Sequence, residues 1–469
     1  MFPKESEVLD LGDYRRFQFT ECIKEKFSTS VLDEGGLSSP LSISLVIPTK
    51  FEPEGILEIE EKTLHRILAQ CSELVDTGYL DEIIVIGATR TAEGKPDFSV
   101  LQKIVAIAYD ELGLFREQVD LLNKYRSQNE KAKRGLTDFF LKALHQFDEN
   151  IPKLLAKYGV FGVTGYFGIL PGKGAGIWLS VPVAQGNIMC FVDADIIDFK
   201  KEYITTLCHP IIYSWNLLEA AIRFVKAHYT RLTVTEEESQ ATILGGRLSR
   251  LLAVPLLKSV TETFKLFAGL ESIKYPLAGE FAVSRDLIEQ LSFPNTYAIE
   301  TSLLFQTYDL IGPTSMAQLD LDIYRHIGQP FEDLENMAYQ VVDSVLREVD
   351  MKLGRRLTNE EKEQLADSYQ KNVNNMLDTY EQTASRLKET EKNLAYSREN
   401  DLQKTKHLEK VIDDVLSGKS KEKRPRYFSF PSWRRIDETT RNYFFLKEML
   451  RRRSNQSTWS RLRECGLLS

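Results

Sequence analysis

Short apolar runs alternate with longer amphipathic stretches along the first 200 residues of the chain. LSISLVIPTK (41–50), DEIIVIGATR (81–90) and NIMCFVDAD (187–195) each consist of a continuous apolar run that stops at polar or turn-forming residues. Such runs predict buried strands. A helical spacing of apolar positions separates the first two, from about Ile56 to Asp76. The alternation of apolar strands with helices predicts an α/β fold with a mainly parallel sheet.

A charged amphipathic stretch over about 97–156 is longer than one crossover helix needs, so we expect at least two helices or an insertion there. The glycine-rich GKGAG (172–176) follows, and a helix is expected to start within Trp178–Ala184, where Pro182 perturbs it.

Outside this core the pattern changes three times. Residues 1–40 predict an irregular lead-in that ends at the turn-rich GGLSSP (35–40), and residues 201–330 mix helix with strand. From 331 to about 416 the chain is charged with helical periodicity and lacks a sustained heptad, which predicts helical hairpins rather than a coiled coil.

The composition bounds the class of protein. The chain has 469 residues, 42% of them hydrophobic, which suffices for two or three domains. A net charge of -8 argues against a general binder of nucleic acid. The five cysteines are widely spaced and form no CxxC, which argues against a disulfide framework. The start of the chain lacks the apolar core of a signal peptide, and no run has the length of a membrane span, so we expect a cytoplasmic protein.

The segment 421–465 departs from this average, because it mixes many arginines with aromatic residues such as Trp433 and Trp459. Interleaved basic and aromatic residues suit a nucleic acid or a membrane surface. They are equally typical of a terminal segment that docks its aromatic side chains on the protein body or on a partner subunit. We expect the docked arrangement.

The third strand raises a chemical question, because it ends in Asp193-Ala194-Asp195. Alternation along an extended chain puts Asp193 and Asp195 on one side, where like charges repel. A divalent cation would remove that repulsion, which makes the tripeptide a candidate metal site. The alternative is a solvated strand end in which Asp195 or Asp198 caps the following helix.

The other polar groups at strand ends limit the classes of enzyme that the chain can belong to. Ligands of parallel α/β sheets bind beyond the carboxyl ends of the strands, where Pro48–Glu52, Gly87–Thr89, Lys173 and the two aspartates fall. The first strand turn, PTKFEPEG, lacks the GxGxxG of a dehydrogenase, and GKGAG lacks the spacing of a P-loop. A sugar-nucleotide transferase remains, with a cation on the diphosphate and Lys173 either reaching a phosphate or lying on a surface turn.

The order of motifs resembles one family. VIPTKFEPE, IIVIG, PGKGAGIW, FVDAD, GGRLSR, YPLAGEFAVSRDL, Tyr297-x-x-Glu300 and His326 follow one another as in the glucosyl-3-phosphoglycerate synthases. The resemblance covers about residues 41–345 and implies a retaining glycosyltransferase of GT-A fold, with a Rossmann-like, mainly parallel sheet and a C-terminal helical extension. It implies transfer of glucose from UDP-glucose to the 2-hydroxyl of 3-phosphoglycerate, for synthesis of the compatible solute glucosylglycerate. It also implies a front-face mechanism, in which the leaving phosphate oxygen helps to deprotonate the acceptor hydroxyl.

The resemblance assigns roles to individual residues. Asp195 and His326 match the metal ligands, for Mg²⁺ or alternatively Mn²⁺ or Co²⁺. Three positions are expected to act in catalysis: Asp195, Glu300 and Lys173. The acceptor would be held by Gly246, Arg247 and Ser249. The nucleotide sugar would be bound by Pro48, Thr49, Lys50, Glu52, Lys173, Asp193, Leu277, Tyr297 and Glu300.

The predicted domains follow from these roles. We expect a lead-in at 1–40, a nucleotide-sugar-binding half at 41–200, an acceptor-binding half at 201–330 and a helical extension with its basic aromatic tail at 331–469. A homodimer is expected, nucleic acid is not, and membrane contact would involve only the tail.

Two departures keep alternatives open. Gly87-Ala88-Thr89 stands where many GT-A enzymes have an aspartate for the base, so GDP-glucose competes with UDP-glucose as the donor. Tyr324 stands where the family often has a basic residue. The alternative functions are a mannosylglycerate-type synthase, a polyprenyl-phosphate glycosyltransferase, and a catalytically silent sugar-nucleotide binder or assembly protein.

Overall fold

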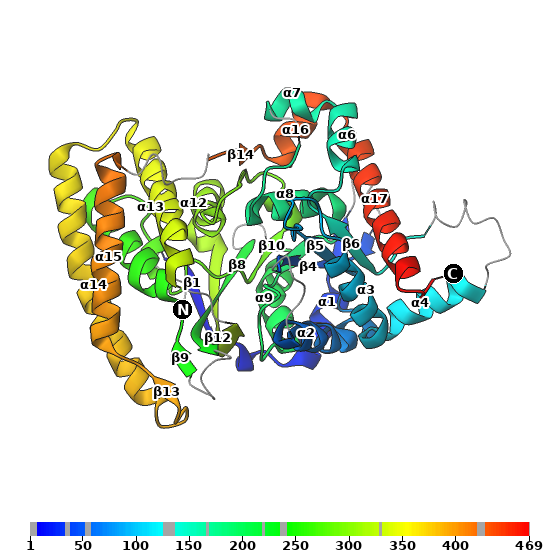
Figure 1. The fold of residues 1–469 in the computed structure, drawn as a ribbon, viewed down its shortest axis with the longest axis horizontal. Helices are drawn as coiled ribbons and strands as arrows, with labels where there is room; N and C mark the ends of the chain where they lie inside the picture. The colour runs from blue at the N-terminus through cyan, green and yellow to red at the C-terminus, as the bar shows by residue number, and fades with distance from the viewer. Residues whose placement is uncertain are drawn as a thin grey trace. The chain divides into compact units, whose positions relative to one another are not determined.

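The chain folds into two compact units that interleave along the sequence. The structure, a computed structural model, describes residues 7–32, 38–51, 58–124, 137–165, 168–217, 221–234, 242–327, 331–419 and 427–468 (Figure 1). Unit 1 comprises Met1–Tyr14, Lys226–Gly279 and Thr296–Phe428, and unit 2 comprises Arg15–Val225, Glu280–Asn295 and Ser429–Ser469. Both units therefore take segments from distant parts of the chain, whereas the sequence predicted four consecutive ranges.

The sheet of unit 2 is mainly parallel, as predicted. Its strand order is β10-β7-β4-β5-β6, in which β4, β5, β6 and β7 run parallel and β10 is antiparallel to β7. These strands read as continuous apolar runs because both faces of the sheet are covered. The strands are β4 (Ile43–Thr49), β5 (Glu82–Gly87), β6 (Leu141–His145), β7 (Ile188–Phe191) and β10 (Phe281–Ser284).

Strand β6 lies within the stretch 97–156, for which the sequence predicted at least two helices or an insertion and no strand. The described residues of this stretch contain three helices, α3 (Ser99–Glu111), α4 (Gly113–Lys124) and α6 (Asn150–Lys157). LKALH lies between them and pairs in parallel with β5. The pattern misleads because Lys142 and His145 are charged or titratable, yet both are buried.

The N-terminal lead-in is also more regular than predicted. Residues 7–32 and 38–40 form β1 (Leu9–Asp13), α1 (Phe19–Ser28), β2 (Ser30–Leu32) and β3 (Ser38–Pro40). In unit 2, α1 packs on α9 (Lys201–Ser214), and α2 (Glu58–Asp76) packs on α3 and α9. Amphipathic helices thus cover the sheet, as the spacing of apolar positions in 56–76 indicates.

In unit 1, strands from both ends of the sequence pair with one another. β1 is parallel to β12 (Met316–Ile327), and β8 (Phe224–Val234) is antiparallel to β9 (Thr242–Leu244). β13 (Leu394–Ala395) extends this sheet by pairing with β9. β9 leads through Gly245–Leu248 into the π-helix η2 (Ser249–Ala253) and the helix α10 (Val254–Phe264).

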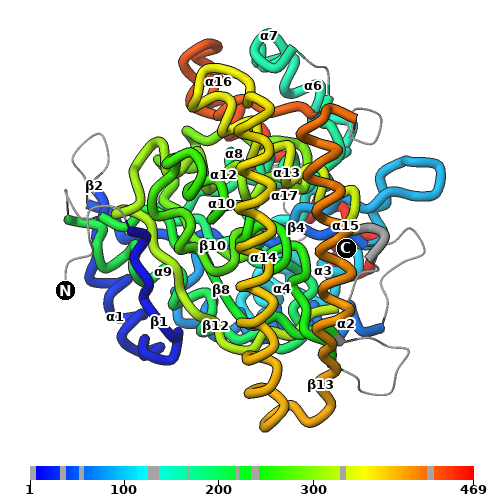
Figure 2. Tube along the Cα trace, turned by 90° about the vertical axis from the view of Figure 1, so that its left-hand side faces the viewer, coloured from blue at the N-terminus to red at the C-terminus, as the bar shows by residue number. Residues whose placement is uncertain are grey.

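Three long helices follow β12 in the described part of unit 1, as the helical hairpins predicted from residue 331. They are α13 (Phe331–Leu353), α14 (Asn359–Leu387) and α15 (Arg398–Leu416), which run side by side in Figures 1 and 2. A capping box starts α14, because Thr358 Oγ1 accepts from Glu361 N at 3.2 Å and Glu361 Oε2 accepts from Thr358 N at 2.8 Å. α14 packs on α10, and α15 packs on η2.

The basic aromatic tail docks on unit 2 instead of extending unit 1. β14 (Ser429–Phe430) pairs with β11 (Phe293–Pro294), and the helices α16 (Trp433–Thr440) and α17 (Tyr443–Glu464) follow. α17 packs on β6, α3 and α8 (Lys173–Val183). This agrees with the expectation that the aromatic residues of the tail dock on the protein body.

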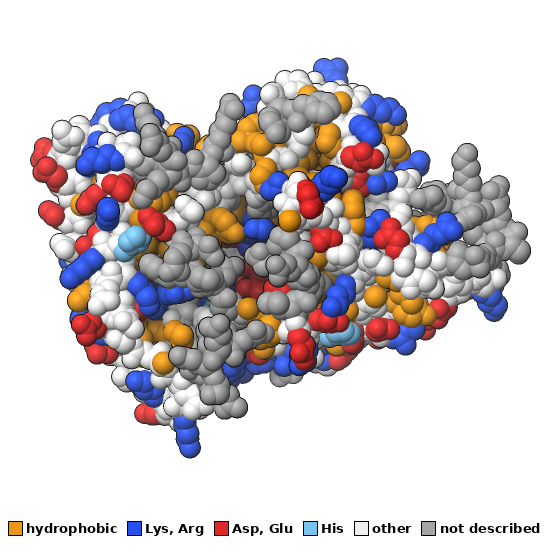
Figure 3. All heavy atoms as spheres, viewed as in Figure 1, with side chains coloured by type: hydrophobic (Ala, Val, Ile, Leu, Met, Phe, Trp, Pro, Cys, Tyr) orange, Lys and Arg blue, Asp and Glu red, His pale blue; other side chains and the backbone are white. Residues whose placement is uncertain are grey.

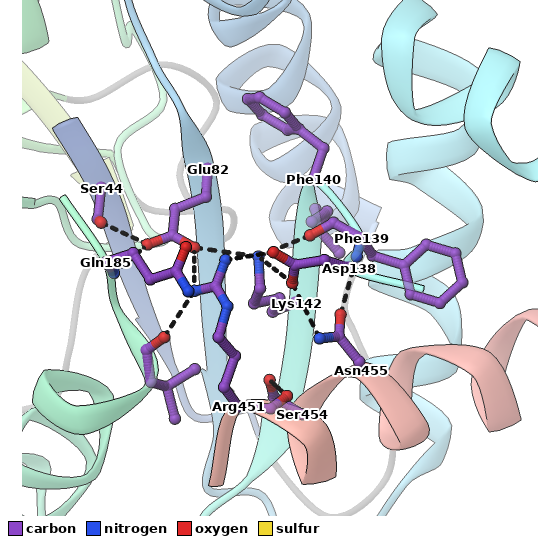
Figure 4. Close-up of polar contacts among 12 residues, drawn as sticks. Ser44, Glu82, Asp138, Phe139, Phe140, Lys142, Gln185, Arg451, Ser454 and Asn455 are labelled. Atoms are coloured by element: carbon purple, nitrogen blue, oxygen red, sulfur yellow. Dashed lines mark hydrogen bonds and ion pairs between the residues drawn. The ribbon is translucent and has the colours of Figure 1, made fainter. Parts of the chain in front are cut away.

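A buried ionic network holds α17 at the amino ends of the parallel strands (Figure 4). Glu82 Oε2 lies 3.0 Å from Lys142 Nζ and 2.8 Å from Arg451 Nη1, while its Oε1 accepts from Ser44 Oγ at 2.5 Å. Arg451 also donates to Asp138 Oδ2 at 2.6 Å. Of these groups, Glu82, Asp138, Lys142 and Arg451 line a cavity of about 690 Å³. Because they satisfy one another, and because ligands of such sheets bind at the opposite ends, we assign the network a structural role.

Candidate active site

The carboxyl ends of the parallel strands in unit 2 are joined by a polar network. Phe51 N donates to Thr89 Oγ1 at 2.9 Å, and the carbonyl oxygen of Thr89 lies 2.7 Å from His145 Nε2. Since Phe147 N donates to His145 Nδ1 at 3.1 Å, Nδ1 is the acceptor and Nε2 carries the proton. Burial lowers the pKa of His145, which keeps the ring neutral. The ends of β4, β5 and β6 are therefore fixed relative to one another.

The predicted contacts on β4 differ in exposure. Pro48 is partly buried, Thr49 is buried with its hydroxyl 3.4 Å from the carbonyl oxygen of Ile86, and Lys50 is exposed. Glu52 lies outside the described residues. A nucleotide contact on this strand would involve the backbone near Pro48 and the Lys50 side chain more readily than the Thr49 hydroxyl.

Gly172 and Lys173 start helix α8, five residues earlier than the sequence predicted. Gly172 has φ 140°, and a Cβ there would lie 1.6 Å from the backbone oxygen of Asn295, so only glycine fits. Pro182 lies inside the helix, as expected. Lys173 Nζ lies 2.8 Å from Asp193 Oδ1, with side-chain exposures of 21% and 28%. The structure thus brings together two residues that the sequence assigned to one pocket.

Asp193 and Asp195 do not continue the alternation of β7, contrary to the prediction. The strand ends at Phe191, and Ala194 and Asp195 lie in a turn. The backbone nitrogen of Asp193 donates to Glu280 Oε1 at 3.4 Å. The repulsion that the extended geometry predicted is relieved because the chain turns, and because Lys173 neutralises Asp193. Both aspartates remain partly exposed.

Two residues that the sequence did not single out position this end of unit 2. Gln146 follows β6 at the site, donates from its backbone nitrogen to the Gly87 oxygen at 2.7 Å and from Nε2 to the Leu170 oxygen at 2.9 Å. It thereby ties the end of β5 to the loop that leads into α8. His145 ties the end of β6 to Thr89, which follows β5. Neither residue was predicted, because the sequence analysis did not predict β6. The mostly apolar run that ends in His145-Gln146 could have indicated this strand and its polar end.

The predicted acceptor segment lies in unit 1, in the turn between β9 and η2. Gly246 has φ 66°, and a Cβ there would lie 2.5 Å from Tyr275 Oη, so the turn requires glycine. Arg247 is partly buried, and Ser249 is 2% exposed as the first residue of η2. The backbone of the turn is held by a hydrogen bond from Gly245 N to the Arg231 oxygen of 2.7 Å.

His326, on β12, lies in the same unit and is 6% exposed. Its Nδ1 lies 2.6 Å from Arg231 Nη2 and 2.6 Å from the Ile327 oxygen, and its Nε2 lies 3.0 Å from Thr233 Oγ1. Burial lowers the pKa of His326 well below its ordinary value, and the charges of Arg231 and Arg247 lower it further. The imidazole is therefore neutral, the form that binds a metal.

The remaining predicted residues of the sugar site also belong to unit 1. Leu277 lies in a turn and is partly buried, and Tyr297 is 40% exposed with its backbone nitrogen 2.9 Å from Gln340 Oε1. Glu300 is 6% exposed in the first turn of α12 (Ile299–Ile311). A carboxylate in this position is stabilised by the helix dipole.

Asp195 and His326 are each of a ligand type that binds divalent cations, and their joint role in a metal site stays a prediction. A carboxylate oxygen from Asp195 and a neutral imidazole nitrogen from His326 suit Mg²⁺, Mn²⁺ or Co²⁺. Asp195 belongs to unit 2 and His326 to unit 1. Within the described parts of the chain, no group of three or more His, Cys, Asp or Glu side chains is arranged to hold a metal.

The chain is similar to one class of curated proteins, all named glucosyl-3-phosphoglycerate synthase, which confirms the resemblance that the motifs indicated. It is 33% identical over 180 residues to the protein of Mycobacterium tuberculosis (strain ATCC 25618 / H37Rv), which is 38% of this chain and 52% of that protein. It is 34% identical over 177 residues to that of Mycolicibacterium smegmatis, 38% of this chain and 54% of that protein. It is 33% identical over 185 residues to that of Petrotoga mobilis, which is 39% of this chain and 53% of that protein. The chain thus spans about half the length of the curated relatives it matches. No protein-family model matches it.

Solved structures with a similar fold carry the same name. The Mycobacterium tuberculosis glucosyl-3-phosphoglycerate synthase in complex with Mn²⁺, UDP-glucose and phosphoglyceric acid has a TM-score of 0.47 and 22% identity, over 73% of this chain and 88% of that chain. Its complex with Mg²⁺ and UDP has a TM-score of 0.47 and 22% identity, over 74% of this chain and 87% of that chain. None of the helices among the described residues is long and apolar enough to cross a membrane.

Proposed function

We propose that the chain is a metal-dependent retaining glycosyltransferase of GT-A fold that moves glucose from UDP-glucose to the 2-hydroxyl of 3-phosphoglycerate. The observation that carries the proposal is the 33% identity over 180 residues to proteins named glucosyl-3-phosphoglycerate synthase. The mainly parallel sheet of unit 2, with polar groups gathered at its carboxyl ends, is the architecture that such a donor site needs.

Lys173 and Asp193 are proposed to act on the donor. Lys173 is the first residue of α8, and the amino end of a helix favours a phosphate. Its ion pair with Asp193 holds the ammonium at the end of β7 until a diphosphate replaces or joins the carboxylate. A divalent cation bound by Asp195 and His326 would neutralise charge on the leaving diphosphate. Glu300 and Tyr297 would bind sugar hydroxyls, with Leu277 against the sugar.

Gly246, Arg247 and Ser249 are proposed to hold the acceptor. Arg247 can pair with a carboxylate or a phosphate through two parallel hydrogen bonds. The φ of 66° at Gly246 turns the chain immediately before Arg247. The compatible-solute role, a homodimer and a cytoplasmic location extend the same resemblance.

The first test is product formation by the purified protein. With Mg²⁺ present, UDP-glucose, GDP-glucose and GDP-mannose would each be combined with 3-phosphoglycerate and with glycerate. We expect a phosphorylated glucoside from UDP-glucose and 3-phosphoglycerate that disappears with EDTA and returns with added Mg²⁺. Transfer from GDP-mannose alone would contradict the glucose assignment, and donor hydrolysis without transfer to either acceptor would contradict the acceptor.

Replacing Asp195 tests the metal role. We expect Asp195→Ala to lower kcat by about a hundredfold or more, because a lost metal contact costs several kcal/mol of transition-state stabilisation. Asp198→Asn, in the same partly exposed segment, is the matched control and should keep normal turnover. Near-normal activity of Asp195→Ala at low Mg²⁺ would reject the role.

A further inference from the structure

Arg90, which follows β5, carries a guanidinium whose hydrogen-bond donors are not used within the described chain. On the face in Figure 3, basic and acidic side chains are interspersed, in keeping with the net charge of -8. Arg90 is exposed, and its guanidinium forms no ion pair or hydrogen bond with any residue that the structure describes. Its guanidinium carbon instead lies 4.6 Å from the ring centroid of Phe147. A cation–π contact leaves the five N–H donors available to another molecule.

The backbone that carries Arg90 is fixed beside the end of β5. Arg90 pairs with Pro96 in an antiparallel bridge, and a hydrogen bond of 2.8 Å from Thr91 N to the Lys95 oxygen closes the turn between them. The preceding residue, Thr89, has its carbonyl oxygen bound at the end of β6. The position of Arg90 is therefore set by the sheet and not by a free loop.

Phe147 is held in the same way after β6. Its backbone nitrogen donates to His145 Nδ1 at 3.1 Å, and its neighbours Gln146 and Asp148 are each 1% exposed. Phe147 itself is partly exposed. Since β5 and β6 are adjacent and parallel, the ring and the guanidinium lie together at the carboxyl ends of two neighbouring strands. Ligands of such sheets bind at these ends.

This pair of side chains lies at the same edge of the sheet as the proposed phosphate contact. Gln146, the residue before Phe147, donates from Nε2 to the Leu170 oxygen at 2.9 Å, and Leu170 lies three residues before Lys173. A nucleoside diphosphate has its phosphates at one end and its base at the other, so a donor held at Lys173 needs a second site for the base. A guanidinium beside an aromatic ring suits a nucleobase, through hydrogen bonds and stacking.

We propose that Arg90, held in place by Phe147, binds the base of the donor and selects uracil through its carbonyl groups. The inference rests on the proposed function. A guanidinium has only N–H donors, so it matches the C4 carbonyl of uracil and opposes the C4 amino group of cytosine. The segment Gly87-Ala88-Thr89 contains no carboxylate that could accept a hydrogen bond from the base. The residue that follows this segment thus supplies a donor instead of an acceptor.

Calorimetric titration of the full chain with UDP and with CDP, in the presence of Mg²⁺, tests the assignment. We expect the wild type to bind UDP about tenfold or more tightly than CDP, the size of a charge-assisted hydrogen bond. Arg90→Ala should weaken UDP binding about tenfold and reduce the preference over CDP to about twofold or less. Arg116→Ala is the matched control, because Arg116 is also exposed and lies over an aromatic ring, that of Tyr109 on α3, at 5.9 Å. It should keep the wild-type affinities.

The outcomes separate this inference from the proposed function. An unchanged ratio of UDP to CDP affinity in Arg90→Ala would overturn the inference, and so would a wild type that binds the two nucleotides equally. In either case, product formation from UDP-glucose by the wild type would leave the proposed function standing. A wild type that binds neither nucleotide and forms no product would overturn both. Equal weakening of UDP binding by Arg90→Ala and Arg116→Ala would also overturn the inference, because it would reflect general charge and not a base contact.

Discussion

A single buried carboxylate, Glu82, ties together segments that are far apart in the sequence. It sits at the start of β5 and is bound by Lys142 from β6 and Arg451 from α17. Burial by itself would raise its pKa, but the charges of Lys142 and Arg451 and the hydrogen bonds from Ser44 and Gln185 lower the pKa of Glu82 to about 2. The charged form of Glu82 therefore stabilises the fold of unit 2.

The lowered pKa of Glu82 predicts that the protein loses stability as the pH falls. The folded-state pKa of about 2 lies below the ordinary value of 4.5, so the stabilisation is present above pH 4.5 and is lost as the pH falls toward 2. Glu82→Gln should flatten that acid slope. It should also lower the free energy of unfolding at pH 7 by about 3–5 kcal/mol, because two buried cations lose their partner.

Urea unfolding at pH values from 7 to about 3 would measure both effects. Glu117→Gln, an exposed carboxylate on the wall of the same cavity, is the control and should follow wild type. An unchanged acid slope in Glu82→Gln would show that the network does not set the acid stability.

At the scale of elements, the donor-side helix α8 depends on the C-terminal tail. Trp433 stacks on Trp178 at 4.3 Å between centroids, and the two indoles exchange bonds with the opposing backbone. Trp433 Nε1 donates to the Trp178 oxygen at 2.7 Å, and Trp178 Nε1 donates to the Pro431 oxygen at 2.9 Å. α8 begins with Lys173, so the tail supports the helix that carries a candidate catalytic residue.

We expect Trp433→Ala to lower the free energy of unfolding by about 3–5 kcal/mol, through the cavity and the lost indole hydrogen bond. Phe444→Ala is the control, because it removes an aromatic side chain of the same tail that is 71% exposed. It should change the free energy of unfolding by no more than about 0.5 kcal/mol. Chemical denaturation of both variants measures the difference. Equal effects would contradict the docked role of Trp433.

The same elements show what the sequence could predict. β4, β5 and β7 were predictable because each is an uninterrupted apolar run, and the long helices after 331 because their periodicity is regular. β6 was not predictable, because the burial of Lys142 depends on its ion pair with Glu82, which is 60 residues away in the sequence. The start of α8 at Lys173 was not predictable either, because its glycine-rich sequence shows no helical spacing of apolar residues. The pairing of Lys173 with Asp193 depends on tertiary structure, although each residue was a candidate.

At the scale of the molecule, the tail is bound to unit 2 by contacts that need no covalent link to residue 419. They include the pairing of β14 with β11, the indole stack, and an ion pair between Arg453 Nη2 and Asp148 Oδ2 of 2.6 Å. Aromatic stacking and buried, hydrogen-bonded ion pairs dissociate only when both partners are hydrated again.

A chain cut within residues 420–426, through an inserted protease site, should therefore keep its tail. We expect the fragment that contains residues 427–468 to co-elute with the remainder in native gel filtration and to separate from it in urea. The uncut insertion protein is the control. Release of the fragment from a remainder that keeps the wild-type melting temperature would contradict the assignment of the tail to unit 2.

The discontinuous make-up of unit 2 has a consequence for the order of synthesis. A ribosome releases β4 to β7 and α8 early, and then translates α13, α14 and α15 before β14, α16 and α17 emerge. During that interval Trp178 and Glu82 lack the indole and the guanidinium that cover them in the finished protein. The donor half can thus be completed only after translation has passed the tail, so a truncated nascent chain would expose apolar surface that chaperones and proteases recognise.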